Sequence, residues 1–357
     1  MSSVTGDKIK LAVFGESHGE AIGCVIDGLP AGLKLDYDRI YCDMARRAPG
    51  RDSTATPRLE RDIPHIISGV LDGVTTGAPL AMLIENENTK SGDYERISDV
   101  LRPSHSDYAA YMKYGGFNDV RGGGHFSGRL TAPLVFAGAV AKQILKEKGI
   151  TLGAHIKRIG EVEDRGFDYN SIDRALLERL TSGSFSVIDE SAESEMRAEI
   201  ARYKAEGNSV GGEIEGAIIG VPAGVGGNMF DTVEGKLSSL LFSIPAVKGV
   251  QFGLGFGFAE SNGAEVNDGY EIKDGRVSLI TNNNGGILGG ITSGAPIVFS
   301  VAVKPTPSIA AKQRSVNLKT MENEMLEIKG RHDPCIVPRA VPVVEAAAAI
   351  ALLDILL

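Results

Sequence analysis

Residues 19–32 of the chain read GEAIGCVIDGLPAG, and residues 211–224 read GGEIEGAIIGVPAG. Both segments fit the pattern G-x-x-I-x-x-x-I-x-G-[LV]-P-A-G, in which spaced isoleucines lead into a turn of Gly, Pro and Ala. Two more pairs of similar segments follow in the same order along the chain. GVTTGAPL at 73–80 is matched by GITSGAPI at 290–297, and Arg102-Pro103-Ser104 by Lys304-Pro305-Thr306. Ordered matches of this kind predict duplication of one supersecondary unit.

The duplication predicts one domain made of two structural repeats, at about 1–158 and 203–357. The charged stretch at about 159–202 lies between them and is expected to be an excursion. Hydrophobic patterning predicts strands at Lys10–Phe14, Leu80–Glu85, Glu213–Ile219 and Pro296–Val303. It predicts helices at Arg129–Lys148, Ile172–Leu180, Glu193–Glu206, Lys236–Leu241 and Val341–Leu357.

Composition limits the classes of partner. A net charge of −9 over 357 residues argues against nucleic acid, and the absence of Trp with only 6% aromatic residues argues against base-stacking platforms. The N-terminus has no apolar signal segment, and the apolar tail Val341–Leu357 is too short for a membrane span. Three cysteines (Cys24, Cys42, Cys335) without a C-x-x-C pair fit a reducing cytoplasm and predict no metal site.

Residues 102–131, RPSHSDYAAYMKYGGFNDVRGGGHFSGRLT, carry the densest chemistry of the chain. Two histidines, three serines and three arginines share this window with the consecutive glycines Gly122, Gly123 and Gly124. Glycine lets backbone amides approach a ligand closely, and neighbouring arginines suit a multiply charged anion. The alternative is a flexible surface loop with scattered charges; the histidines and arginines inside one window favour a site.

A second motif, Gly15-Glu16-Ser17-His18-Gly19, follows the predicted strand Lys10–Phe14. Glycines on both sides expose Ser17 and His18 to a ligand, and His suits proton transfer near neutral pH. The alternative is a structural histidine whose hydrogen bonds are satisfied within the fold.

An arginine-rich segment runs from Arg39 to Arg61. It holds six arginines against the three acids Asp43, Asp52 and Glu60, a net +3. Arginine at every basic position favours bidentate binding of phosphate or carboxylate, although a solvated helix end is the common alternative.

In the second half, Gln251–Phe258 (QFGLGFGF) lacks the spacing of a dinucleotide fingerprint and predicts close-packed strands. Asn282–Gly290 (NNNGGILGG) and Lys304–Ser308 (KPTPS) better suit a planar cofactor lying against backbone, with Lys304 near its phosphate or ring. Gly330–Pro342 (GRHDPCIVPRAVP) is expected to hold Arg331, Asp333 and Arg339 in one turn-rich loop.

These blocks, taken in order, resemble the chorismate synthase family over nearly the whole chain. The matching blocks are GESHG at 15–19, RPSHSDY at 102–108, KYGGFNDVRGGGHFSGR at 113–129, GGILGGITSG at 285–294, KPTPSI at 304–309 and GRHDPCIVPRAVP at 330–342. The resemblance implies an α+β sandwich with internal duplication, in which long helices lie between two antiparallel sheets, and a homotetramer.

The resemblance also implies the reaction. A chorismate synthase is a lyase that converts 5-enolpyruvylshikimate 3-phosphate to chorismate by anti 1,4-elimination, with loss of phosphate from C3 and hydrogen from C6. Reduced FMN is expected as a transient electron donor, with NADPH only as an indirect reductant. A substrate with one phosphate and two carboxylates needs several fixed arginines, which agrees with the residues above.

Position by position, the resemblance implies five catalytic residues. His18 and His105 match the acid/base histidines, one for the departing phosphate and one for the reduced flavin. Asp333 matches an aspartate that helps flavin N5 accept the C6 proton, and Ser17 and Ser127 match serines of the same proton relay.

The resemblance also implies binding residues. Expected FMN contacts are His125, Phe126, Ser127, Pro245, Ala246, Gly289, Lys304, Pro305, Thr306, Pro307, Ser308 and Arg331, and expected contacts of substrate or NADP are Arg47, Arg51, Arg121, Arg129 and Arg339.

Two positions depart from the family pattern. Most relatives read GGGRSSAR where this chain reads GGGHFSGR, so His125 replaces an arginine and Phe126 a serine. Many relatives have an arginine six residues after Arg47, where this chain has Ser53, and Arg51 is the candidate substitute.

Two other functions remain open from sequence. A flavoprotein reductase would bleach FMN with NADPH alone, but no dedicated nicotinamide domain is visible. A non-enzymatic flavin- or phosphate-binding assembly protein is disfavoured by the presence of His18, His105 and Asp333.

Overall fold

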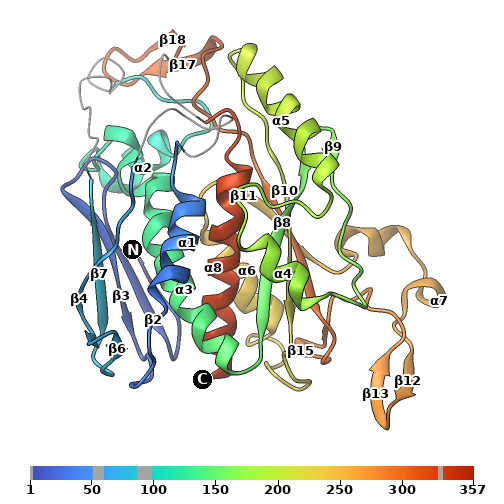
Figure 1. Ribbon diagram of the computed structural model, residues 1–357. Coiled ribbons are helices and arrows are strands. Elements are labelled where there is room, and N and C mark those ends of the chain that lie inside the picture. The colour runs from blue at the N-terminus through green and yellow to red at the C-terminus, as the bar shows by residue number, and fades with distance from the viewer. Residues whose placement is uncertain (1–2, 51–59, 87–98, 329–332) are drawn as a thin grey trace.

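The two recurring glycine-rich segments form the central strands of two separate sheets. The computed structural model describes residues 3–50, 60–86, 99–328 and 333–357. Each sheet has five strands and every pairing is antiparallel, as Figure 1 shows on the two sides of a helical layer. In order across the first sheet the strands are β1 (Val4–Thr5), β2 (Lys10–Gly15), β3 (Ala21–Asp27), β7 (Leu80–Glu85) and β4 (His65–Ser68). In the second they are β11 (Val247–Phe252), β16 (Ile297–Val303), β10 (Gly212–Ile219), β8 (Thr151–Ile159) and β9 (Val162–Glu163).

The two halves have matching element orders. The strand order β2-β3-β7-β4 in the first sheet corresponds to β8-β10-β16-β11 in the second. Other elements fall at corresponding places in each half: α1 (Tyr37–Arg47) with α6 (Val233–Ser243), α3 (Thr131–Glu147) with α8 (Val337–Leu356), and the hairpin β5 (Val70–Leu71) and β6 (Val74–Thr75) with β14 (Ile287–Leu288) and β15 (Ile291–Thr292).

We propose that these halves are the two repeats expected from the sequence. Because β8 belongs to the second sheet, we place the boundary near residue 150 rather than at the expected 158. The expected excursion holds β9, α4 (Arg174–Leu180) and most of α5 (Glu190–Ala205). Phe167, Leu177, Leu180 and Ile188 of this stretch pack on Ala217 and so cover the outer face of the second sheet.

The remaining elements are short. They comprise α2 (Asp107–Tyr114), α7 (Gly263–Val266), the 3₁₀ turns η2 (Arg121–Phe126), η3 (Gly128–Leu130) and η4 (Gly255–Glu260), and the hairpins β12 (Tyr270–Lys273) with β13 (Arg276–Leu279) and β17 (Gln313–Asn317) with β18 (Glu322–Leu326).

The predicted strands and helices are confirmed to within a few residues, and the α+β sandwich is confirmed with them. The sequence prediction missed α1 and α2. QFGLGFGF is a strand only through Phe252, after which η4 follows.

The two long helices α3 and α8 cross inside the sandwich at Gly138. A Cβ on Gly138 would overlap the Cα and Cβ of Ala346, so glycine is what allows this close approach. Helix α8 is buried along nearly its whole length. Within the described residues, no helix is both long and apolar enough to cross a membrane.

A buried ionic cluster lies beside this crossing. Glu345 of α8 accepts hydrogen bonds from Arg46 of α1 (2.7 and 2.8 Å) and from Lys142 of α3 (2.6 Å). Arg46 also pairs with Asp43. Arg46 was one of the arginines expected to capture an anion, and that interpretation is wrong for this residue, because its charge is neutralised inside the core.

Replacement of Gly138 by alanine is expected to destabilise the protein. Overpacking costs roughly 1–3 kcal/mol, which outweighs the helix-propensity gain of up to about 1 kcal/mol. Urea unfolding measures the loss. The matched control is Gly183→Ala, because a Cβ on Gly183 would meet no atom within 4 Å. Equal stability of the two variants would show that the helix crossing is loose.

Candidate active site

The glycines Gly122, Gly123 and Gly124 form a strip of backbone between two histidines. All three have positive φ (59°, 89° and 53°), a conformation that suits glycine. A Cβ on Gly122 would overlap the imidazole of His18 and lie 2.9 Å from Ser17 Oγ. A Cβ on Gly123 would lie 3.2 Å from Cε1 and Nε2 of His105. The structure therefore brings the two predicted acid/base histidines to one segment that carries no side chains.

The loop that carries Ser17 and His18 is fixed by backbone and amide contacts. The Ser17 N–H donates to the Gly124 carbonyl (3.1 Å), and the side-chain amide of Asn86 donates to the carbonyls of Glu16 (3.0 Å) and Gly19 (2.8 Å). The expectation that flanking glycines expose Ser17 and His18 is wrong: the two residues are only 2% and 7% exposed, because the glycine strip packs against them.

His105 is held by a carboxylate. Its Nδ1 lies 2.5 Å from Asp107 Oδ1, and Asp107 also accepts from the backbone N–H (3.0 Å), Nε (2.8 Å) and Nη2 (2.7 Å) of Arg102. Burial alone would raise the pKa of Asp107, but the hydrogen bonds from His105 and Arg102 outweigh it and hold that pKa far below its ordinary value. Asp107 is thus a carboxylate throughout the physiological range.

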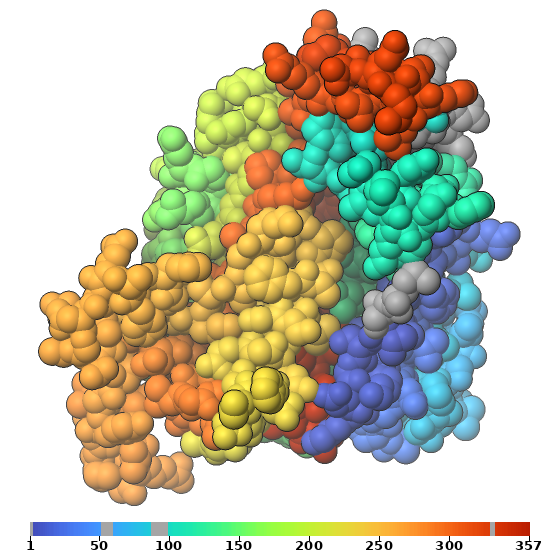
Figure 2. Space-filling view, turned by 180° about the vertical axis from the view of Figure 1, so that it is seen from behind, coloured from blue at the N-terminus to red at the C-terminus, as the bar shows by residue number. Residues whose placement is uncertain are grey.

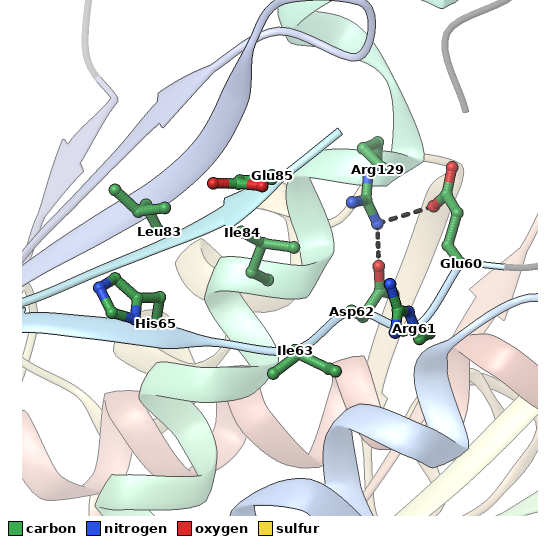
Figure 3. A pocket seen from close by; sticks show the side chains of 9 residues that line it. All are labelled: Glu60, Arg61, Asp62, Ile63, His65, Leu83, Ile84, Glu85 and Arg129. Carbon is green, nitrogen blue, oxygen red and sulfur yellow. Dashed lines mark hydrogen bonds and ion pairs between the residues drawn. The ribbon is translucent and has the colours of Figure 1, made fainter. Parts of the chain in front are cut away.

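Two of the expected substrate arginines share one buried carboxylate. Arg47 Nη1 lies 2.6 Å from Asp62 Oδ2, and Arg129 Nη1 pairs with Asp62 Oδ1 and, at 2.7 Å, with Glu60. Figure 3 shows the Arg129 contacts at one end of a cavity of about 270 Å³ that His65, Leu83 and other residues line.

The pKa values in this cluster reflect burial and charge together. Burial lowers the pKa of Arg47 to about 10, with Asp62 opposing the shift and the charges of Arg339 and Arg129 adding to it. For Asp62, burial would raise the pKa, but the two guanidinium groups more than offset burial and lower it.

Arg339 joins the same cluster from the second half. Its Nε donates to the Arg47 carbonyl (3.0 Å), and its Nη1 pairs with Asp333. The expectation that Arg339 and Asp333 share one turn-rich loop is wrong, since Arg339 lies in the first turn of α8 while Asp333 precedes the helix. Arg51 and Arg331 lie outside the described residues.

Arg121 lies apart from that cluster. It forms a two-point pair with Asp119 (both contacts 2.9 Å), and its side chain is 48% exposed. The carbonyl of Asp119 packs directly against Gly124, so this pair borders the glycine strip on the His18 side.

The segment after the glycines uses its side chains within the fold. Both ring nitrogens of His125 have protein partners, the Gly15 carbonyl (2.8 Å) and Ser3 Oγ (2.9 Å). Phe126 is 37% exposed beside Tyr114, and Ser127 Oγ accepts from the Arg129 N–H. Ser127 Cβ is also the next neighbour of Gly123 after His105.

The segment Lys304–Ser308 packs against the histidine segment of the first half. Lys304 Nζ donates to the Ser104 carbonyl, next to His105, and the Lys304 N–H donates to the Ala246 carbonyl (2.9 Å). Burial and the nearby charge of Lys248 lower the pKa of Lys304. Pro245 and Ala246 therefore lie with the segment that continues through Pro305, Thr306, Pro307 and Ser308.

Thr306 has an unusual hydroxyl. Its Oγ1 is buried and has no hydrogen-bond partner within the part of the chain that the structure describes. The surface is hollowed between α2 (teal) and the yellow segment of the second half, as Figure 2 shows. A buried hydroxyl without a partner is costly unless a ligand or water satisfies it.

Gly289 is not brought to this place. It lies in the β14–β15 turn, beyond the N-terminal end of β16, whereas Lys304 follows the C-terminal end. A seven-residue strand spans roughly 20 Å, so Gly289 and Lys304 of the same chain lie too far apart to contact one ligand group.

Several residues of the site were not predicted from sequence. These are Asn86, which also accepts from Arg129 Nε (3.1 Å), together with Asp62, Glu60, Arg102, Asp107 and Asp119. Asp62 follows directly after the arginine-rich segment, and this position could have indicated that its carboxylate pairs with an arginine.

The fold and the site define an enzyme that pairs two histidines with a cluster of buried arginines. The family model for chorismate synthase matches residues 9–357. The chorismate synthase of Pyrococcus abyssi is 49% identical over 352 residues, 99% of this chain and 97% of the relative. That of Dehalococcoides mccartyi strain BAV1 is 44% identical over 357 residues, 100% of this chain and 97% of the relative. A crystal structure of a chorismate synthase superposes with a TM-score of 0.78 at 29% identity, covering 99% of this chain and 92% of that one.

The chain belongs to the chorismate synthase family. It is a carbon–oxygen lyase of the shikimate pathway that eliminates phosphate from 5-enolpyruvylshikimate 3-phosphate to form chorismate.

Replacement of Gly122 by alanine is expected to lower kcat/KM by at least about 100-fold, because the new Cβ displaces His18. Steady-state turnover measures the loss. Gly115→Ala is the matched control: its φ is similar (62°), but a Cβ there would come no nearer than 3.8 Å to Phe117. If both variants lose the same activity, the loss comes from backbone strain and not from His18.

Replacement of Asp62 by asparagine leaves two buried guanidinium groups underpaired and is expected to cost roughly 3–5 kcal/mol at neutral pH. The depressed pKa of Asp62 contributes stability above the unfolded value of about 3.9 and loses it as pH falls through the folded value. The difference between wild type and variant therefore shrinks below about pH 4.

Urea unfolding at several pH values measures this difference. The matched control is Asp72→Asn, since Asp72 shares the left-handed φ of Asp62 (51° and 50°) but is exposed. A pH-independent cost for Asp62→Asn would rule out its ionised carboxylate as the source of stability.

Proposed function

We propose that His18 and His105 carry the proton transfers of the elimination, on the two sides of the strip Gly122–Gly124. The observation that supports this is the position of both imidazoles against one glycine segment with no side chain between them. Proton transfer by a positioned side chain contributes about 10²–10⁴-fold to a rate. Ser17 and Ser127, which border the same strip, are proposed to relay protons with Asp333.

The substrate's phosphate and carboxylates are proposed to bind at the arginines around Asp62, with Arg121 on the His18 side. The contacts described above use Nε and Nη1 of both Arg129 and Arg339. Within the described residues, Nη2 of each is left for an anion. The internal carboxylates fix the guanidinium planes in advance, which suits recognition of a rigid polyanion. Arg51 remains a candidate for the same role. Arg47 is proposed to orient the cluster instead, because all three of its side-chain nitrogens have protein partners: Nε donates to Thr131 Oγ1 (3.1 Å), Nη1 to Asp62 (2.6 Å) and Nη2 to the Gly128 carbonyl (3.0 Å).

Reduced FMN is proposed as the cofactor, and the residues present fit it. The buried Thr306 hydroxyl has no hydrogen-bond partner among the described residues, and Lys304 places a cation beside the segment that carries His105. When bound, reduced FMN supplies an electron transiently without net redox change. The residues proposed to hold it are Ser127, Pro245, Ala246 and Lys304–Ser308, with His125 and Phe126 contributing through backbone and ring face, since both His125 nitrogens are engaged.

A homotetramer located in the cytoplasm is also proposed. The outer face of the first sheet exposes Phe14 (41%) and Ile67 (56%), whereas residues of the excursion cover the corresponding face of the second. A contact of FMN with Gly289 would require a second copy of the chain. Light scattering is expected to give four times the chain mass of 37.7 kDa, and a monomer would refute the tetramer.

An anaerobic assay tests the proposed chemistry. Chorismate and free phosphate are expected with chemically reduced FMN and none with oxidised FMN, and His105→Ala is expected to slow turnover by about 10²–10⁴-fold. NADPH with FMN but without a reductase should give no product and no bleaching of flavin absorbance. Equal turnover with oxidised FMN, or an unchanged rate for the variant, would contradict the proposal.

A further inference from the structure

The two ring nitrogens of His105 have different surroundings. Nδ1 lies 2.5 Å from Asp107 Oδ1, whereas Nε2 has no hydrogen-bond partner within residues 3–50, 60–86, 99–328 and 333–357. The Nε2 edge faces Gly123, where a Cβ would lie 3.2 Å away. Nδ1 is therefore bonded to a protein side chain, whereas Nε2 faces the glycine strip that His18 also borders.

The proton in the short contact belongs to the histidine. A lone pair on Nδ1 facing a carboxylate oxygen at 2.5 Å would be repelled, so a hydrogen lies between the two atoms. Asp107 does not carry it, because Arg102 donates three hydrogen bonds to that carboxylate and stabilises its charge. Neutral His105 then has its proton on Nδ1 and a lone pair on Nε2.

The other charged and polar neighbours are consistent with this arrangement. The side chains of Arg102, His105 and Asp107 are 8%, 16% and 16% exposed, so water screens their contacts weakly. Arg102 Nη2 lies 3.1 Å and Ser106 Oγ 3.4 Å from Nδ1, and Lys304 contacts the carbonyl of Ser104. Asp107 is the one carboxylate that contacts the ring among the described residues.

We propose that Asp107 is a positioning residue for the reaction: it holds His105 with a proton on Nδ1 and so makes Nε2 the atom that gives and takes the catalytic proton. Arg102 supports this role by keeping Asp107 ionised and oriented. The inference rests on the acid/base role proposed above for His105. Removal of the carboxylate should lower kcat with little change in KM, because substrate binding does not use Asp107.

The direct test is the ¹⁵N signature of His105 in the wild-type protein. Long-range ¹H–¹⁵N spectra of labelled protein distinguish the two neutral tautomers, and His105→Gln identifies the signal among six histidines. We expect the Nδ1–H form at alkaline pH. A dominant Nε2–H form in the wild type would overturn the proposal, with no dependence on the folding of an Asp107 variant.

Kinetics give the second readout. Asp107→Asn is expected to lower kcat by roughly 10- to 100-fold, as for other removed histidine partners, with KM within a few-fold and a mixed tautomer signal. The matched control Asp99→Asn removes an exposed carboxylate from the same segment and should change neither. An Asp107→Asn variant with wild-type kcat and tautomer would overturn the inference. Absence of chorismate from the wild type would instead refute the proposed function and leave the tautomer result standing.

Discussion

A strip of backbone without side chains, Gly122–Gly124, sets the geometry of the site. Its positive φ angles suit glycine, and at Gly122 a single methyl group would occupy the space of the His18 ring. The loop 15–19 docks on this strip through Ser17, and His105 lies on its other side. Two histidines that are 87 residues apart in sequence thereby face one backbone segment. This arrangement suits the proposed proton transfers, in which one imidazole serves the substrate and the other the flavin.

The duplicated architecture explains how distant arginines meet. The corresponding helices α3 and α8 cross at Gly138, and each begins beside the Asp62 cluster. Arg129 lies two residues before α3 and Arg339 in the first turn of α8, so each half contributes one guanidinium. Helix N-termini carry partial positive charge, which favours an anion at the same place. The halves differ elsewhere: the first supplies the two histidines proposed for proton transfer, and the second supplies Lys304 and Thr306.

Much of this was predictable from the sequence, and the failures have physical causes. Long periodic segments such as 131–147 and 297–303 identify their own structure. His18 stood out because glycines flank its motif, and His105 because it shares one window with arginines and three consecutive glycines. The partner of each arginine could not be predicted, because ion pairing depends on contacts across the fold. Arg46, for example, pairs with Glu345, 299 residues away. The count of charges in the arginine-rich segment ended at Arg61, one residue before Asp62, which pairs with Arg47 of that segment and with Arg129 far along the chain. His125 was expected at the flavin, and only the structure shows that its ring nitrogens bond to the Gly15 carbonyl and Ser3 Oγ.

A crystal structure with oxidised FMN and 5-enolpyruvylshikimate 3-phosphate bound tests the arrangement most directly. The imidazole of His18 and Nε2 of His105 should each lie about 3 Å from a ligand atom, with the ligands stacked over Gly122–Gly124 and Thr306 Oγ1 satisfied. Ligands bound elsewhere, for example in the cavity beside His65 and Leu83 with neither imidazole in contact, would contradict it.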